Sequence, residues 1–538
     1  MLFNSLEFIL WFLPLTLFIW FQLGQRGYRQ WAIGWLLFAS LFFYGWWNPV
    51  NLPILLGSVG LNYWIGALLT HNSPRLSQKG LLVLGIVANL AVIGYFKYAN
   101  FFIDSLNPIA GTDFTLGQII LPLGISFFTF QQIAYLVDAY RGEAKGYRFI
   151  DYTLFVAFFP QLIAGPIVHH KDLITQFKNK EIYQANAANL AIGITIFAIG
   201  LFKKVMFADG LSACANAVFD AVTNGTSPSF FEAWMGSLAY TLQLYFDFSG
   251  YSDMAIGIGQ MFGILLPLNF NSPYKATSIV DFWNRWHITL SRFLRDYLYI
   301  PLGGNRRGEM RRSINLFITM LLAGLWHGAG WTFVFWGGLH GVYLIINHQW
   351  RSFRQRVLHH DLSQRPCWES LLGGCITFLA VVFGWVFFRA NDMSTAFTVL
   401  DGMIGLNGFS LPEEWSTTFS FLNEWNVQFN GLMPQIEINT GGINDVELSP
   451  STWLRNIALL LLFVWFMPNT QEIFSEHQPI LNYKKVKQRI GMLKQPNNDK
   501  KRVVQWQPNQ GWAILCAGLT AIALLHLTRV SQFLYFEF

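Results

Sequence analysis

The residue best suited to chemistry is a histidine within an apolar stretch. His327 is the only ionisable residue between Arg312 and His340, and Gly324 and Gly328 lie on either side of it. An imidazole titrates near neutral pH, so it can act as a general base toward a hydroxyl group without a charged partner. We therefore interpret His327 as a candidate catalytic base. The alternative is a hydrogen-bonded histidine of the core.

A second histidine, His287, lies in the segment 281–292, where apolar and charged residues alternate too closely for a helix that faces lipid. The chain continues to a basic turn at Arg306 and Arg307. This pattern is typical of an interfacial or re-entrant helix. Arginines there can hold an anionic donor, while a hydroxyl acceptor reaches His327 from the opposite side. The alternative is that Arg306 and Arg307 only fix the orientation of the chain in the membrane. The alternative role for His287 is to orient another group by hydrogen bonding.

Two carboxylates, Asp247 and Asp253, interrupt another apolar stretch, with Ser249, Gly250 and Ser252 between them. Their spacing does not place them on one face of a helix. The pattern predicts a broken helix that lines a polar cavity. The alternative is that the two carboxylates pair with an arginine or cap helix ends.

Several other chemistries are excluded by missing motifs. The sequence has no HExxH, CxxC, phosphate-binding GxxxxGK[ST], GxSxG or GxGxxG pattern in a suitable context. We therefore expect no bound metal or cofactor and no coupling to nucleotide hydrolysis. The net charge of +6 does not indicate a nucleic-acid partner, because basic residues between apolar spans serve to orient a chain in a membrane.

The elements that position these residues are predicted to be membrane helices. Of the 538 residues, 53% are apolar, 17% aromatic and only 12% charged, whereas about 25% charged residues is ordinary for a soluble chain. A soluble enzyme is nearly excluded. We predict an all-α polytopic membrane protein of about 11 to 14 transmembrane and re-entrant helices. The apolar spans lie at 1–23, 31–47, 52–70, 80–103, 119–137, 149–168, 187–207, 230–246, 254–268, 313–326, 331–348, 370–388, 453–467 and 511–527.

The short neighbouring spans 313–326 and 331–348 are predicted to be half-depth helices that meet inside the protein. If the inner surface lies at Arg312, the helix rises only about 22 Å to His327 at 1.5 Å per residue. That is less than the ~30 Å thickness of a hydrocarbon core. His327 would then lie at the base of a depression that opens to the outside.

Charges between the spans predict the orientation. The loop 469–510 has eight Lys and Arg against three acids, whereas the loop 401–452 has seven acids and no Lys or Arg. By the positive-inside rule the first is cytoplasmic and the second lies outside. Arginines at 351–365 and 306–312 fall on the inner side in the same topology. The aromatic residues of the acidic loop suit contact with a protein partner. The alternative is that they pack the loop onto its own helices.

Several sequence blocks, in order, resemble the membrane-bound O-acyltransferase (MBOAT) family, in its alginate O-acetyltransferase-like branch. The blocks are Pro122–Phe130, Phe159–Ile167, Tyr245–Asp253, Asn269–Tyr274, Phe282–His287, Asp296–Arg306, Gly324–Gly328 and Trp336–Gly341. In the final third, Met467–Thr470 looks like a late motif of this branch. The resemblance implies a disc of helices with a funnel on each face and a central tunnel.

The resemblance also implies roles for individual residues. His327 corresponds to the catalytic histidine of the family, and His287 to the polar residue of its Trp-Arg-Trp-His block. Asn284 stands where many members of the branch have Arg. The expected supporting residues are Asn284, Arg285, Asp253 and Trp326, and the residues expected to bind the acyl donor are Arg295, Arg306 and Arg307.

We expect five regions along the chain. They are N-terminal transmembrane helices (1–118), the catalytic core (119–348), a transmembrane helix with its flanks (349–400), the acidic extracytoplasmic loop (401–452), and C-terminal helices (453–538) with the basic loop 469–510.

The predicted function is transfer of an acetyl group from a cytoplasmic donor, most simply acetyl-CoA, toward a polysaccharide hydroxyl outside the bacterial inner membrane. The acceptor could also be an extracytoplasmic relay protein or a polysaccharide synthesis complex. Alternatives are D-alanyl or lipid O-acyl transfer and, in a different class, a transporter or polymer-export channel. Transporters are commonly built from two related halves, and the 282–307 pattern has no second copy here.

Overall fold

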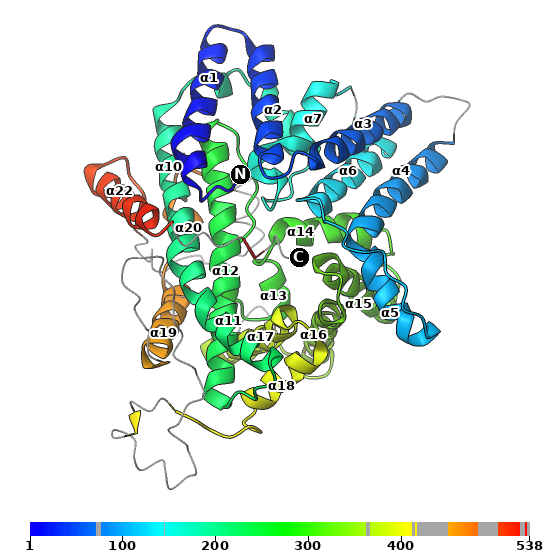
Figure 1. The fold of residues 1–538 in the computed structure, drawn as a ribbon, viewed down its shortest axis with the longest axis vertical. Helices are drawn as coiled ribbons and strands as arrows, with labels where there is room; N and C mark the ends of the chain where they lie inside the picture. The colour runs from blue at the N-terminus through cyan, green and yellow to red at the C-terminus, as the bar shows by residue number, and fades with distance from the viewer. Residues whose placement is uncertain are drawn as a thin grey trace.

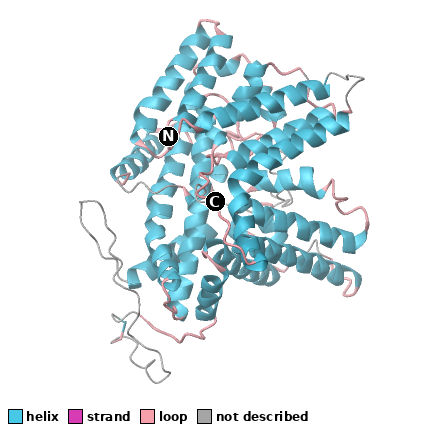
Figure 2. Ribbon diagram, turned by 45° about the vertical axis from the view of Figure 1, so that its right-hand side comes forward, coloured by secondary structure: helices cyan, strands magenta, loops and turns pink. Residues whose placement is uncertain are grey.

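The computed structural model describes residues 1–70, 77–144, 146–361, 366–411, 415–416, 450–481, 504–527 and 533–534. Most of the predicted acidic loop and most of the predicted basic loop lie outside the described residues. The predictions of a docking role for the first and of a cytoplasmic position for the second therefore stay predictions. Figure 2 shows the described chain as helices joined by loops.

Helices form most of the described structure, as composition predicted. The first half contains η1 (Phe8–Phe12), α1 (Leu13–Gln25), α2 (Arg29–Gly45), α3 (Asn51–Thr70), α4 (Gln78–Ile93), η2 (Gly94–Tyr98), α5 (Ala99–Ala110), α6 (Ile125–Tyr140), α7 (Phe149–Ala157), α8 (Phe159–Leu162), α9 (His170–Ile174), η3 (Gln176–Lys178), η4 (Glu181–Tyr183), α10 (Ala187–Phe202), η5 (Lys203–Ala208), α11 (Asp209–Thr223) and α12 (Phe230–Met261). The second half contains η6 (Pro273–Lys275), α13 (Ile279–Trp283), α14 (Ile288–Leu294), η7 (Arg295–Tyr299), α15 (Gly308–His327), α16 (Trp331–Arg356), α17 (Cys367–Arg389), α18 (Met393–Met403), α19 (Pro450–Phe466), α20 (Thr470–Ile473) and α22 (Gln510–Leu525).

Five helical segments in the described part of the chain are long and apolar enough to cross a membrane. They are Phe8–Gln25, Asn51–Thr70, Gln78–Ala110, Ala187–Thr223 and Cys367–Arg389. Large apolar side chains point outward from several of the outer helices; Trp11 and Trp31 are 75% and 73% exposed. Such side chains suit contact with lipid rather than water. The chain is therefore an all-helical polytopic membrane protein.

Helix α12 runs through the middle of the molecule, with α10 and α11 alongside (Figure 1). The sequence predicted a break between Asp247 and Asp253, and this prediction was wrong, since α12 continues unbroken for 32 residues. A capping box of Ser229 and Glu232 starts the helix. Gly250, at the position of the predicted break, packs against α10 instead of breaking α12.

Lysines of the π-helical turn η5 neutralise the two aspartates of α12. Lys204 Nζ lies 2.7 Å from Asp247 Oδ1 and 2.7 Å from Asp209 Oδ1. Lys203 Nζ lies 2.6 Å from Asp253 Oδ2. The carboxylates thus form ion pairs as the alternative interpretation proposed, but with lysines rather than arginines. A paired carboxylate does not require a polar cavity, so the helix need not break.

Two glycine pairs bring α10 and α12 into close contact. A Cβ atom at Gly193 would lie 2.6 Å from the Gly257 carbonyl oxygen, and one at Gly200 would lie 2.6 Å from that of Gly250. Any larger side chain at these positions would force the helices apart. Small residues at helix interfaces are the usual means of close packing in membranes.

Helices α15 and α16 form a tightly packed hairpin. They contain 20 and 26 residues, so the prediction of two half-depth helices underestimated the length of both helices. A Cβ atom at Gly324 would lie 2.9 Å from Gly337 Cα, which explains why glycine suits this crossing. At 1.5 Å per residue, α15 spans about 30 Å, and His327 is its last residue.

Candidate active site

His327 lies where α15 ends and the backbone becomes extended at Gly328. The histidine is 4% exposed. Its ring lies among three aromatic rings, with centroid separations of 4.8 Å to Trp326, 5.2 Å to Trp336 and 5.2 Å to Phe388. These rings exclude water from most of the imidazole and restrict its orientation, which is the condition for a positioned general base.

A small cavity, here called the histidine cavity, gives His327 an opening. It has a volume of about 40 Å³ and is lined by Lys97, the segment 121–127, Ile163, Trp326 and His327. This volume accommodates water or a hydroxyl group but not a sugar ring. An acceptor therefore has to present a single hydroxyl group to this cavity, or the cavity has to widen.

His287 is fully buried and held by a hydrogen-bond network. Its Nδ1 lies 3.0 Å from Asn269 Oδ1, which also accepts the Thr289 hydroxyl at 2.9 Å. The Asn269 amide nitrogen donates to Ser252 Oγ at 3.2 Å. Because Asn269 Oδ1 is an acceptor, Nδ1 of His287 carries the proton and Nε2 carries the lone pair. His287 also has a left-handed backbone with φ of 42°, which is uncommon for residues other than glycine.

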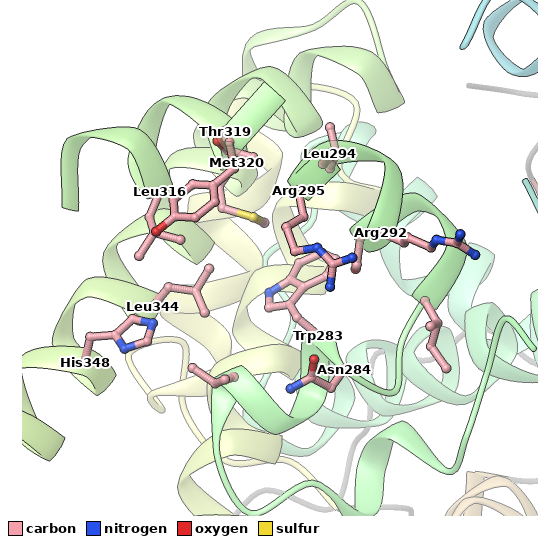
Figure 3. Close-up of a pocket in the computed structure, with 14 residues that line it drawn as sticks. Trp283, Asn284, Arg292, Leu294, Arg295, Leu316, Thr319, Met320, Leu344 and His348 are labelled. Atoms are coloured by element: carbon pink, nitrogen blue, oxygen red, sulfur yellow. The ribbon is translucent and has the colours of Figure 1, made fainter. Parts of the chain in front are cut away.

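A larger cavity, here called the arginine cavity, lies along the middle of α15, at Leu316, Thr319 and Met320. Its volume is about 340 Å³, within the range of small-molecule sites. Figure 3 shows Arg295 extending into it beside Trp283, with Asn284 and His348 on its walls. Arg292 also lines it, but its guanidinium points away, with NH1 3.4 Å from Asp172 Oδ2.

The two cavities lie at different levels of the same helix. Met320 lines the arginine cavity and His327 lines the histidine cavity, about 10 Å apart along the helix axis at 1.5 Å per residue. The cavities share no lining residue. The central tunnel implied by the family resemblance therefore stays a prediction, while α15 provides the direct structural link between the two cavities.

Comparison with known proteins identifies the family. The sequence model of the MBOAT, membrane-bound O-acyltransferase family matches residues 137–369. The chain is 43% identical over 506 residues to the peptidoglycan O-acetyltransferase of Helicobacter pylori, a match that covers 89% of this chain and 91% of the relative. The chain belongs to the membrane-bound O-acyltransferase family. The resemblance stated from the sequence blocks is confirmed, and so is the class of enzyme, an O-acyltransferase.

Two further relatives of this O-acyltransferase carry related names. It is 45% identical over 419 residues to the "probable alginate O-acetylase AlgI" of Pseudomonas aeruginosa, covering 77% of this chain and 76% of the relative. It is 27% identical over 288 residues to the teichoic acid D-alanyltransferase of Streptococcus thermophilus, covering 50% of this chain and 69% of the relative. Acetyl and D-alanyl transfer are thus both represented among its relatives.

The structure brings only some of the predicted site residues of the O-acyltransferase to the two cavities. Trp326 lines the histidine cavity, and Asn284 and Arg295 line the arginine cavity. Arg285 instead donates from Nε to Asp281 Oδ1 at 2.9 Å. Asp253 is paired with Lys203, and neither residue belongs to the lining of these cavities. For Arg285 and Asp253 the structure therefore favours roles in holding the fold.

The basic turn that follows η7 does not contribute to the arginine cavity either. Arg306 and Arg307 are exposed, and neither belongs to the cavity lining. Arg295 pairs with Asp296, with Nε 2.7 Å from Oδ1. Of the three arginines predicted to bind the donor, Arg295 is the one placed in the arginine cavity.

Sequence reasoning missed two residues of the O-acyltransferase, one that contacts His287 and one that contacts His327. Asn269 was noted as part of a block, but it had no assigned role. Lys97 was included in the span 80–103 without comment, although an ionisable residue within an apolar span is itself a signal of function. Its ammonium lines the histidine cavity beside His327. The same signal could have found Lys203 and Lys204.

Proposed function

We propose that this enzyme moves an acetyl group from acetyl-CoA in the cytoplasm to a glycan hydroxyl outside the bacterial inner membrane, either directly or through an extracytoplasmic relay protein. The observation that carries the proposal is the position of His327, at the end of one helix whose middle part lines a cavity with an arginine. A donor whose thioester sits on a long flexible arm suits the distance of about 10 Å along the helix between the two cavities.

In the proposed reaction His327 accepts the proton of the acceptor hydroxyl. The hydroxyl oxygen then attacks the acetyl carbonyl, forming the ester C–O bond as the C–S bond of the thioester breaks. The proton passes from His327 to the departing thiolate. Arg295 holds an anionic group of the donor, and its planar guanidinium suits phosphate oxygens.

His287 is proposed to act beside His327. Both rings contact the Trp326 indole, and the Asn269 hydrogen bond leaves Nε2 of His287 as an acceptor. A neutral imidazole with a defined tautomer can orient a hydroxyl or relay a proton. We assign His287 this orienting role and His327 the role of general base.

The acceptor is proposed to be a polysaccharide of the cell envelope. The relatives at 43% and 45% identity are named for peptidoglycan and alginate acetylation. The peptidoglycan relative is similar over the larger share of the chain, 89% against 77%, so peptidoglycan is the first acceptor to test. D-alanyl transfer is the second candidate, supported by the 27% identity to a D-alanyltransferase.

The proposal is tested in a strain that lacks the gene. Ester-bound acetate is released by mild alkali and measured separately from peptidoglycan and from secreted polysaccharide. We expect acetate to be lost from one of these polymers and restored by the wild-type gene but not by His327→Ala. Unchanged acetate in both polymers, with loss of ester-linked D-alanine instead, would overturn acetyl transfer in favour of D-alanyl transfer.

A further inference from the structure

Helix α15 ends with carbonyl groups that its own hydrogen bonds cannot satisfy. The last four carbonyls of any α-helix lack a partner within the helix, and burial makes each unsatisfied carbonyl costly. The backbone after His327 is extended rather than left-handed, so no glycine C-cap motif satisfies these carbonyls. The groups that satisfy them therefore come from another part of the chain.

Those groups come from the π-helical turn η2 in the span Gln78–Ala110. Lys97 Nζ donates to the Trp326 carbonyl at 2.6 Å and to the His327 carbonyl at 3.1 Å. The Tyr98 hydroxyl donates to the Leu325 carbonyl at 2.9 Å. Three successive carbonyls at the end of α15 are thus capped by two adjacent side chains, from a segment outside the range that matches the family model.

The position of Lys97 also places a positive charge next to the catalytic region. Its ammonium lies over the Trp326 indole, 5.9 Å from the ring centroid, and lines the histidine cavity together with His327. A charge within an apolar span is costly. The negative end of the α15 dipole compensates for that cost here. The turn η2 that carries Lys97 is π-helical, and such turns are frequent at functional sites.

We propose that Lys97 is a positioning residue for His327, and that it sets the direction of the imidazole by clamping the last turn of α15 from outside the catalytic core. Tyr98 assists through Leu325. The inference rests on the proposed function in taking His327 as the general base. It extends the active site to a helix that the sequence blocks did not include.

The test uses the full-length protein in proteoliposomes with acetyl-CoA as donor and a muropeptide as acceptor. Lys97→Met removes the charge and both hydrogen bonds, Lys97→Arg restores the charge and donors, and Tyr98→Phe removes one hydrogen bond. Lys79→Met is the matched control, because Lys79 is an exposed lysine at the start of the same span. Thermal unfolding in detergent verifies that each variant is folded.

We expect Lys97→Met to lower kcat about 10²-fold, the typical effect of displacing a catalytic group by about 1 Å. KM for acetyl-CoA should not change, because the arginine cavity shares no residue with the histidine cavity. Lys97→Arg should recover much of the loss, Tyr98→Phe should give a smaller loss, and Lys79→Met none. A kcat for Lys97→Met equal to that of the control, or a change in acceptor KM alone, would overturn the proposal.

A second readout does not depend on acetyl transfer. Diethylpyrocarbonate modifies accessible imidazoles, and mass spectrometry reports the rate at His327. Because the histidine cavity is too small to admit this reagent readily, modification of His327 should be slow in the wild type. We expect the rate to be several-fold higher in Lys97→Met, where the imidazole is released, and unchanged in Lys79→Met. If the wild-type protein does not use acetyl-CoA, the proposed function fails but this measurement still decides the role of Lys97, since an unchanged rate contradicts positioning.

Discussion

The imidazole of His287 and the imidazole of His327 share one aromatic neighbour. Their ring centroids lie 6.3 Å and 4.8 Å from the Trp326 indole. Trp326 in turn stacks on Phe130 at 5.1 Å, with an angle of 15° between the ring planes. The two histidines are therefore held in one aromatic cluster, although His287 lies just before α14 and His327 lies at the end of α15.

Removal of the His327 imidazole is expected to abolish most activity. His327→Ala should lower the rate of acetyl transfer about 10²–10⁴-fold, the usual contribution of a general base. The protein should still insert in the membrane, because the substitution removes no span. Acetyl content of the polymer, measured together with the amount of protein in the membrane, tests this. Normal acetyl content in a well-expressed variant would remove His327 from the mechanism.

Loss of the Asn269 amide is expected to affect catalysis through His287. Asn269→Leu leaves the His287 Nδ1–H and the Thr289 hydroxyl without their acceptor, so stability should fall by about 1–3 kcal/mol and kcat should fall as well. Asn62→Leu is the control, because Asn62 is buried in a hydrogen-bonded pair with Asn89. Equal kcat values for the two variants would count against a role for His287.

The arginines predicted to bind the donor can be ranked by how much their removal raises KM for acetyl-CoA. Arg295→Ala should raise KM for acetyl-CoA about tenfold or more, since a hydrogen bond between charged groups contributes about 1.5–3 kcal/mol. The double variant Arg306→Ala/Arg307→Ala should change KM less, because both side chains are outside the arginine cavity. A larger effect of the double variant would assign donor binding to the basic turn, as predicted from the sequence.

The buried ion pairs of α12 are expected to be structural. Lys204→Met leaves Asp247 and Asp209 without their shared cation, which should lower stability by about 3–5 kcal/mol. Arg148→Ala breaks the exposed pair with Asp151 and should cost about 0–1 kcal/mol. Thermal unfolding in detergent measures both. Similar midpoints for the two variants would contradict this assignment.

The α15–α16 crossing should tolerate no side chain at its closest point. Gly324→Ala places a Cβ atom 2.9 Å from Gly337 Cα, whereas Gly338→Ala in the same hairpin meets its nearest atom at 3.6 Å. We expect Gly324→Ala to lower both stability and kcat, because it displaces the helix that carries His327. Gly338→Ala should resemble the wild type in both. Parallel assays of activity and unfolding compare the two.

Local sequence was sufficient for the class of protein and for singling out His327 as a candidate. A composition with few charges and many aromatic residues indicated membrane helices, since burial in lipid is the main constraint on such a chain. His327 could be singled out because an ionisable residue in an apolar stretch is costly. Residues close in sequence carried both signals, so no knowledge of tertiary contacts was needed.

Other features depended on contacts between distant segments. Asp247 and Asp253 looked like a helix break because the lysines that neutralise them belong to η5 and not to α12. Arg295 and Arg306 both looked like donor ligands from their charge, whereas the fold places Arg295 in the arginine cavity and leaves Arg306 exposed outside it. Lys97 became part of the site only when η2 packed against the end of α15. Unsatisfied carbonyls and buried charges acquire partners through tertiary packing, and no local pattern states which partner a given group will have.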